Sequence, residues 1–477
     1  MSITVVGCDG APLSPAARAA LDEATLVVGG ARHLDALGLR GARDGDADHG
    51  SDVQAAGVGA GRTSVDAAPA TITLGPLAPA IDALAAHNGP ATVLASGDPG
   101  FFGVLRALRD AGLEPVAVIP AVSSIAAAFA RAGIPWDDAL VVSAHGDGHG
   151  RDLRHAANVC RAHPKVALLT GPGAGAAQLA RELLIGGAAP DRVLIVAQRL
   201  GEHSPIINRP NKTKIFSETT QNRIDEAQTF DDQERVEILT LEQAAARHDD
   251  GRDGFASPNV VLCLDPRLLP RSLGLGESRR GASSKRWLAG WTGRGGEWAL
   301  GESAFEHRDG QITKAEVRAQ IVARLAPSVG DLVWDLGAGS GSVGIECARF
   351  GAAVIAVEQD TESCRRIAAN AAAHGVEVAV VRGRAPGVLA ELPRPDAVFV
   401  GGGGLDVVRG ALEHGPARVV VALASVERVG EVVRSLEADG REVGGVLTQF
   451  SRLAALPDGT HRFAALNPVY LIWGSTT

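Results

Sequence analysis

The chain has little cysteine, few aromatic residues and no excess of positive charge. Its five cysteines include no CxxC pair, which argues against a disulfide framework or a zinc site and favours free thiols in a reducing cytosol. Aromatic residues make up only 4% of the chain, which does not suit an aromatic-rich β-sandwich. The net charge of -9 argues against a nucleic-acid binder that depends on phosphate neutralisation.

Long hydrophobic runs are also missing. No apolar stretch approaches the roughly 18 to 20 residues that a membrane-spanning helix needs. The N-terminal sequence MSITVVGCDG has neither the charged start nor the apolar core of a signal peptide. We therefore expect a cytoplasmic protein that does not bind membranes.

What the chain does have is a repeated α/β pattern over 477 residues, enough for two to three domains. In residues 1–265, short apolar runs such as 91–95, 166–170 and 260–265 alternate with helical segments and Gly/Pro/Asp turns. This pattern indicates sheets covered on both faces, and the change near Pro120 indicates two sheets. Residues 41–70 indicate a surface loop, and 203–235 an inserted surface segment without chemistry of its own.

A second α/β series follows a basic stretch. Residues 266–300 are rich in Arg, Gly and Ser, and indicate either a solvated linker or a lip that attracts an acidic substrate. In residues 301–477 we expect strands at 332–336, 354–358, 376–382, 397–400 and 419–423. With helices between them, these strands predict one doubly wound, Rossmann-like sheet.

A glycine-rich turn joins the expected strand at 332–336 to the helix that follows it. Asp335 closes the strand and Gly337, Gly339 and Gly341 form the turn, while Glu358 ends the next strand, where it could accept hydrogen bonds from ribose hydroxyls. The turn also fits GxGxxG, so NAD competes with S-adenosylmethionine as its ligand. A carboxylate at Asp335 would repel a pyrophosphate and suits the cationic amino-acid part of S-adenosylmethionine, which we therefore favour.

The second domain resembles a known family at several separate segments. FEHRDGQITKAEVRA (305–319), DLGAGSGSVGIE (335–346), RGRAP (382–386), LPRPDAVFVGGGG (392–404) and NPVYL (467–471) resemble the C-terminal class I module of the decarboxylating precorrin-6Y C5,15-methyltransferase family. The resemblance adds Thr313 and Ala385 to the expected donor-binding residues.

The first domain carries weaker motifs that agree with this resemblance. ASGDPGFFG (95–103) follows a strand, and IPAVSSIAAAFARAGIPW (119–136), LLTGP (168–172) and SPNVVLCL (257–264) come later. Together they resemble the tetrapyrrole methylase family, whose fold of two α/β subdomains holds S-adenosylmethionine between them. The residues that the resemblance places at this cofactor are Gly97, Asp98, Pro99, Ser123, Ser124, Thr170, Gly171 and Pro172.

The resemblance implies the reaction as well as the fold. It implies S-adenosylmethionine-dependent methylation of precorrin-6Y at C5 by the first module, and at C15 with loss of the C12 acetate carboxyl by the second, giving precorrin-8X in cobalamin biosynthesis. It also implies one donor site per module, no metal and a homo-oligomer. A cobalt-containing substrate, a methyltransferase acting on RNA and a non-catalytic scaffold remain alternatives.

Three residues are candidates for contact with the tetrapyrrole. Its carboxylates need cations, and Lys314 and Arg318 would project from one helical face, although both could equally be solvated. Thr313 and Glu316 would form a capping box at the start of that helix. His145 could act as an acid or base in the first module, or be a histidine bonded to backbone groups.

Overall fold

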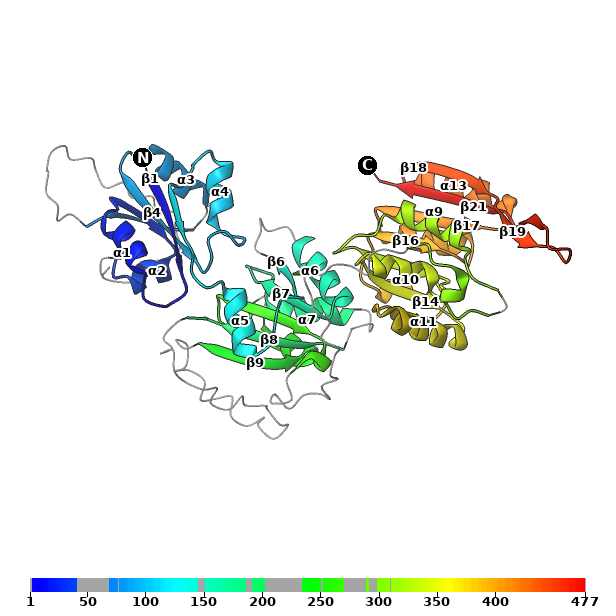
Figure 1. Ribbon diagram of the computed structural model, residues 1–477, viewed down its shortest axis with the longest axis horizontal. Helices are drawn as coiled ribbons and strands as arrows, with labels where there is room; N and C mark the ends of the chain where they lie inside the picture. The colour runs from blue at the N-terminus through cyan, green and yellow to red at the C-terminus, as the bar shows by residue number, and fades with distance from the viewer. Residues whose placement is uncertain are drawn as a thin grey trace, which may run out of the picture. The chain divides into compact units, whose positions relative to one another are not determined.

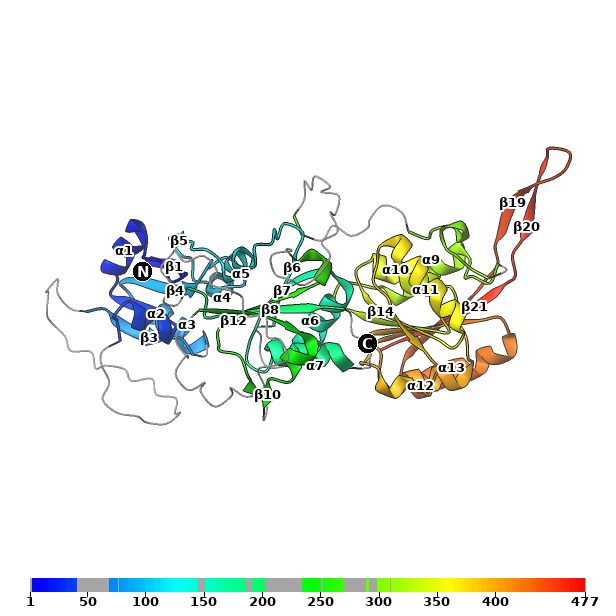
Figure 2. The same ribbon diagram turned by 90° about the horizontal axis from the view of Figure 1, so that it is seen from below.

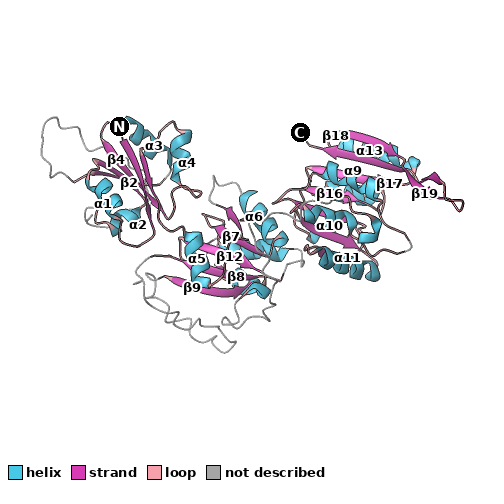
Figure 3. Cartoon of the chain, in the orientation of Figure 1, coloured by secondary structure: helices cyan, strands magenta, loops and turns pink. Residues whose placement is uncertain are grey.

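The computed structural model describes most of the chain as two compact units (Figures 1 and 3). The described residues are 2–40, 68–75, 77–144, 151–185, 191–201, 234–249, 252–269, 289–290, 298–308 and 310–476. The first unit consists mainly of residues 1–131, and the second of 132–198 and 235–477. Among the described residues no helix combines the length and the apolar character needed to cross a bilayer.

The first unit is a parallel sheet with helices on both faces. Its strand order is β3-β2-β4-β1-β5 and all of its ladders are parallel. Alternate residues of β1 enter different cores, because Ile3 and Val5 pack in one cluster and Val6 in another. The strands are β1 (Ser2–Cys8), β2 (Leu26–Gly29), β3 (Ala70–Thr73), β4 (Pro90–Ser96) and β5 (Ala117–Ile119). The helices are α1 (Pro15–Asp22), α2 (Ala31–Ala36), α3 (Leu77–Ala86), α4 (Val104–Asp110) and α5 (Ser124–Ala132).

The second unit begins with a mixed sheet of order β6-β7-β12-β8-β9. Only β6 and β7 pair in parallel, and β12 runs antiparallel to both of its neighbours. Every residue of β12 is buried, as its continuous apolar run predicts. The strands are β6 (Leu140–Ser143), β7 (Lys165–Leu169), β8 (Val193–Gln198), β9 (Arg235–Thr240) and β12 (Asn259–Leu264). The other elements are α6 (Arg151–Ala162), α7 (Ala176–Leu184), α8 (Leu241–Ala245), β10 (His248–Asp249), β11 (Arg252–Asp253) and the short helix η2 (Pro266–Leu268).

The doubly wound sheet predicted for the C-terminal part is confirmed. Its order is β15-β14-β13-β16-β17-β21-β18, in which the first five strands are parallel and β21 is antiparallel to both of its neighbours. The strands are β13 (Leu332–Leu336), β14 (Ala353–Glu358), β15 (Ala379–Arg382), β16 (Ala397–Val400), β17 (Arg418–Leu423), β18 (Glu442–Thr448) and β21 (Val469–Ser475). A separate hairpin of β19 (Ser451–Ala455) and β20 (His461–Ala465) extends beyond this sheet (Figure 2).

Helices cover both faces of this sheet. α9 and α10 lie on one face, and α12 and α13 on the other (Figure 2). β13 serves both cores, because Val333 packs with α9 and α10, whereas Trp334 packs with α12 and α13. The helices are α9 (Ala315–Leu325), α10 (Ser342–Arg349), α11 (Thr361–His374), α12 (Leu405–Leu412), α13 (Val429–Ala438) and the short η4 (Glu302–Ala304), η5 (Leu389–Glu391) and η6 (Val426–Arg428).

Several sequence predictions fall mostly or wholly outside the described residues. These are the surface loop at 41–70, the insertion at 203–235, much of the linker at 266–300, and His145. Arg235, the last residue of the expected insertion, already begins β9. The predicted domain limits 1–265 and 301–477 remain predictions.

Candidate functional site

The glycine turn, residues 337–341, lies at the carboxyl end of β13, where the strand order reverses toward β16. Gly337, Gly339 and Gly341 all have positive φ, of 71°, 58° and 74°. A Cβ on Gly341 would lie 2.9 Å from Ile367, and one on Gly337 would lie 3.0 Å from the backbone of Gly402. A Cβ on Gly339 would meet nothing within 4 Å. Packing therefore requires a glycine at 337 and 341, whereas the position of a Cβ on Gly339 lies in open space.

Glu358 supports this turn from the end of β14. Its Oε2 accepts a hydrogen bond from the Gly339 amide at 2.9 Å, and its Oε1 accepts from the amides of Gln359 and Asp360 at 2.8 and 3.0 Å. A carboxylate has about four acceptor positions, so one remains open, on Oε2. This geometry fits a carboxylate that orders the turn and can still accept a bond from a ribose hydroxyl.

Asp335 lies buried beneath the turn. This position contradicts the expectation that its carboxylate is exposed to the charged part of the ligand. The side chain is 1% exposed, Oδ2 accepts a hydrogen bond from the Gly344 amide at 2.9 Å, and Oδ1 is buried without a partner. Burial raises the pKa of this carboxyl to about 7, so the protonated and charged forms are present in comparable amounts at neutral pH. Asp335 thus fastens α10 to β13.

Arg318 is a core residue, which contradicts its expected position on a face open to substrate. Its guanidinium is fully buried, donates to Glu346 Oε1 at 3.3 Å and to the carbonyls of Thr313 (2.6 Å) and Leu300, and lies 4.8 Å from the centre of the Phe305 ring. All these partners are internal, so Arg318 does not reach a substrate in this structure. The helical spacing gave a wrong prediction because Arg318 lies on the buried face of α9, together with Val322 and Leu325.

The start of α9 also differs from the prediction. The helix begins at Ala315 with Lys314 as its N-cap, so Thr313 and Glu316 form no capping box. The Ala315 amide donates instead to Glu302 Oε1 at 2.8 Å. Lys314 is half-buried, and its Nζ donates to the Gly310 carbonyl at 3.2 Å, so its role toward substrate remains a prediction.

Arg452 binds two carboxylates close to the start of α9. Its guanidinium on β19 binds both Glu302 and Glu316, with N–O distances of 2.5–2.8 Å. These hydrogen bonds lower the pKa of Glu302 to about 2 and also lower that of Glu316. Sequence reasoning missed this group because Arg452 lies 136 and 150 residues from its partners.

Other loops end at the same edge of the sheet. Ala385 follows β15 and precedes Pro386, and residues 401–404 follow β16. Gly403 and Gly404 have φ values of 89° and 77°. Parallel strands bring these loops to the edge that carries the glycine turn, so Ala385 lies at the expected edge, and its contact with a donor remains a prediction.

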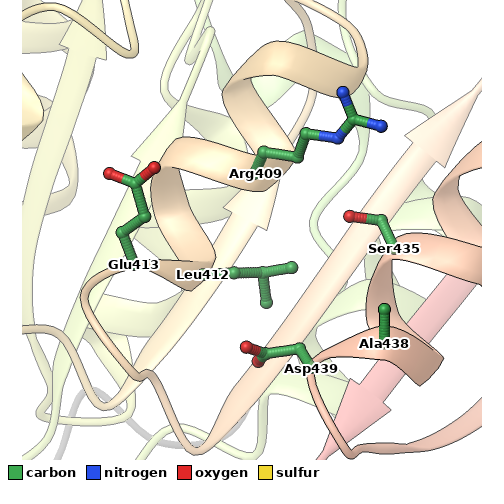
Figure 4. Close-up of a pocket in the computed structure, with 6 residues that line it drawn as sticks. All are labelled: Arg409, Leu412, Glu413, Ser435, Ala438 and Asp439. Atoms are coloured by element: carbon green, nitrogen blue, oxygen red, sulfur yellow. The ribbon is translucent and has the colours of Figure 1, made fainter.

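A hollow of about 270 Å³ lies elsewhere, between α12 and α13 (Figure 4). Its lining residues are Arg409, Leu412, Glu413, Ser435, Ala438 and Asp439. They belong to the C-terminal ends of the two helices, whereas the strand loops of the glycine-turn edge lead into helix N-termini. The hollow is therefore at the opposite edge of the sheet and is not part of the candidate site.

In the first unit, the structure brings Gly97 and the two predicted serines together. Gly97 has φ +61°, and a Cβ there would lie 3.0 Å from Ser123 Cα and 3.2 Å from the Ser124 amide nitrogen. Gly7 lies close to Gly97 as well, since a Cβ added to Gly7 would lie 2.2 Å from the Gly97 carbonyl oxygen. The segments that follow β1, β4 and β5 thus meet backbone to backbone at this edge.

The acidic residues of this edge order its turns. Asp98 Oδ1 accepts a hydrogen bond from the Gly100 amide at 2.9 Å. This bond makes Asp98–Pro99–Gly100 a turn that is stabilised by its own side chain. Asp9 Oδ2 accepts from the Val122 amide at 3.2 Å. Sequence reasoning missed Asp9, although an acidic residue directly after the first strand was a signal that could have found it.

The remaining predicted residues of the first module belong to the second unit. Thr170, Gly171 and Pro172 follow β7, and the Thr170 hydroxyl donates to the Asn259 carbonyl at 2.7 Å. That these three residues face the same cofactor as Gly97 remains a prediction.

Two family models match the chain. The model described as "Precorrin methyltransferase domain" matches residues 303–474, and "Tetrapyrrole (Corrin/Porphyrin) Methylases" matches residues 6–204. These ranges contain the glycine turn and the Gly97 edge, respectively. The mixed architecture of the described sheets agrees with a tetrapyrrole methylase fold followed by a class I methyltransferase domain.

Curated relatives give the same result. The precorrin-6Y C(5,15)-methyltransferase [decarboxylating] of Sinorhizobium sp is 33% identical over 422 residues, with 87% of this chain and 81% of that protein covered. The probable cobalt-precorrin-6B C(15)-methyltransferase (decarboxylating) of Pyrobaculum calidifontis is 37% identical, with 36% of this chain and 92% of that protein covered. The cobalt-precorrin-7 C(5)-methyltransferase of Salmonella typhimurium is 31% identical, with 42% and 85% covered. The chain belongs to the precorrin-6Y C5,15-methyltransferase (decarboxylating) family, and it is an S-adenosylmethionine-dependent methyltransferase.

Proposed function

We propose that this enzyme methylates precorrin-6Y at C5 and C15 and removes the carboxyl group of the C12 acetate, giving precorrin-8X in cobalamin biosynthesis. The observation that carries the proposal is the presence of both family domains on one chain, aligned over most of its length with a relative named for both methylations.

The two reactions divide between the modules in this proposal. The C-terminal domain performs C15 methylation and decarboxylation, and the N-terminal module methylates C5. Two shorter relatives, named for a C15 and a C5 methylation, each align with about two fifths of this chain or less. The division is thus supported by proteins that carry one reaction each.

Each module holds its own molecule of S-adenosylmethionine. Its sulfonium supplies an electrophilic methyl group, and the chain must hold the accepting carbon on the axis of the breaking bond and exclude water. In the second module, Glu358 would accept a bond from a ribose hydroxyl, and the nucleoside would lie against the open side of Gly339. Both features are those that a nucleoside at this sheet edge requires.

The substrate assignment is tested by mass spectrometry of the products. The whole chain is incubated with S-adenosylmethionine and either precorrin-6Y or its cobalt-containing counterpart, because two relatives are named for cobalt-precorrins. We expect precorrin-6Y to gain two methyl groups and lose one carbon dioxide. Turnover of the cobalt compound alone would move the enzyme to the cobalt-containing reaction, and no turnover of either would overturn the proposal.

The division of labour is tested with a variant of the second site. Glu358→Ala removes the acceptor that holds the Gly339 amide, so we expect C15 methylation and carbon dioxide release to be lost while C5 methylation of a C15-methylated substrate persists. Survival of both reactions with unchanged donor affinity would show that this turn is not the second donor site.

We also propose a homo-oligomer assembled through the hairpin of β19 and β20. Leu453 and Phe463 lie opposite each other in its register and are 63% and 72% exposed. An isolated hairpin with such a pair is marginally stable unless something covers it. Light scattering should show a smaller assembly for the double variant Leu453→Thr, Phe463→Thr.

The cytoplasmic location and the absence of nucleic-acid and membrane partners remain predictions.

A further inference from the structure

Asn370 on α11 uses both ends of its side-chain amide. It is 3% exposed; its Oδ1 accepts from the Glu306 amide at 2.7 Å, and its Nδ2 donates to the carbonyls of Glu306 and Ser340 at 3.0 and 2.9 Å. The orientation of the amide follows from these partners, because a backbone N–H can only donate and a carbonyl can only accept. Both N–H groups of Asn370 are therefore used.

These hydrogen bonds join two segments that are distant in the sequence. Ser340 belongs to the glycine turn, between Gly339 and Gly341, and Glu306 belongs to the lead segment, which we define as residues 300–308. Asn370 pairs with both backbone groups of Glu306, much as a neighbouring strand would. One buried side chain thus holds the turn and the lead segment together.

The lead segment is fastened on both sides of Glu306. Leu300 donates its amide to Glu346 at 2.8 Å, the Ala304 carbonyl lies 2.8 Å from His374 Nε2, and Phe305 is buried against Ile345. The segment is therefore held in place independently of Asn370. Loss of the Asn370 bonds would release the Ser340 carbonyl more readily than it would release the segment.

We propose that Asn370 is a positioning residue for the second donor site. It holds the Ser340 carbonyl, and with it the positive φ values of Gly339 and Gly341, in the conformation that binds the S-adenosyl group. This inference rests on the proposed function only for the identity of the ligand. Asn370 itself touches no reacting atom.

Two variants test this role. Asn370→Leu removes all three bonds while keeping the branching of the side chain, and Asn370→Asp keeps the bond from the Glu306 amide but turns an oxygen toward the Ser340 carbonyl. Binding is measured by calorimetry of the full-length chain with S-adenosylhomocysteine, and kinetics by the donor KM for carbon dioxide release. We expect about a ten-fold loss of affinity at one class of sites, as for a lost buried hydrogen bond, and a matching rise of this KM.

A control variant separates positioning from stability. Thr448→Val removes another buried side-chain bond of the same domain, the 3.0 Å bond from Thr448 Oγ1 to the Val469 carbonyl. We expect it to lower Tm without changing donor affinity. Unchanged affinity in Asn370→Asp, with a Tm loss like that of the control, would overturn the positioning role. If the wild-type chain binds S-adenosylhomocysteine but does not turn over precorrin-6Y, the substrate proposal fails while the binding test of Asn370 still stands.

Discussion

Gly339→Ala is the sharpest test of where the second donor site lies. The residue has φ +58°, and a Cβ at this position would project into open space within the structure. The left-handed conformation costs an alanine roughly 1–2 kcal/mol of folding free energy. At about 2–4 °C per kcal/mol for a domain of this size, Tm should fall by several degrees.

The added methyl group has a second effect only if a ligand occupies that space. Overpacking by one methyl group typically costs about 1–3 kcal/mol, which corresponds to a rise of roughly 5- to 150-fold in the Kd of the donor. The assay is the donor KM for carbon dioxide release from precorrin-6Y, with C5 methylation of a C15-methylated substrate as a separate reference that should not change.

Gly440 provides a matched control. It has φ +76°, and a Cβ added there would also meet no atom within 4 Å, but the residue follows α13 at the opposite edge of the sheet. Gly440→Ala should lower Tm by a similar amount and leave the donor KM unchanged. If the two variants behave alike in both measurements, the open face of Gly339 is not where the donor binds.

Two further perturbations test the buried charges. Since burial raises the pKa of Asp335 from 3.8 to about 7, the folded state binds this proton more tightly than the unfolded state, and the unfolding free energy should fall as pH rises from about 4 to 7. In Asp335→Asn, which cannot titrate, the unfolding free energy should fall by up to about 4 kcal/mol less over this pH range, measured by urea denaturation. Parallel profiles of unfolding free energy against pH for the two proteins would contradict this prediction. Arg318→Ala removes the nearer of the two arginines paired with buried Glu346, leaving Arg349 at 3.9 Å, and should cost up to about 3–5 kcal/mol in denaturant unfolding; normal stability with a raised tetrapyrrole KM would restore the substrate role for Arg318.

Local pattern was sufficient to predict the sheet and the position of its glycine turn. The strands 332–336 and 397–400 were predicted with the bounds that the structure shows, because continuous apolar runs between glycine and proline turns indicate buried parallel strands. The glycine spacing after Asp335 was equally informative, since positive φ values are a property of single residues and their neighbours. The motifs around Gly97 and Ser123 were predicted to share a site, and their backbones do meet.

Contacts between distant segments could not be predicted in this way. Helical spacing placed Arg318 on an exposed face, but only packing decides which face is covered, and here it is the one that pairs with Glu346. The same holds for Arg452, which binds two carboxylates more than 130 residues away, and for Asn370, which reads as an ordinary helix residue until the fold brings Ser340 and Glu306 to it. The sequence by itself determined the family and the sheet, because motifs and apolar runs are local features of the chain. The tertiary structure alone decided which polar side chains, such as Arg318 and Asn370, are buried partners of distant groups, because only packing brings those groups together.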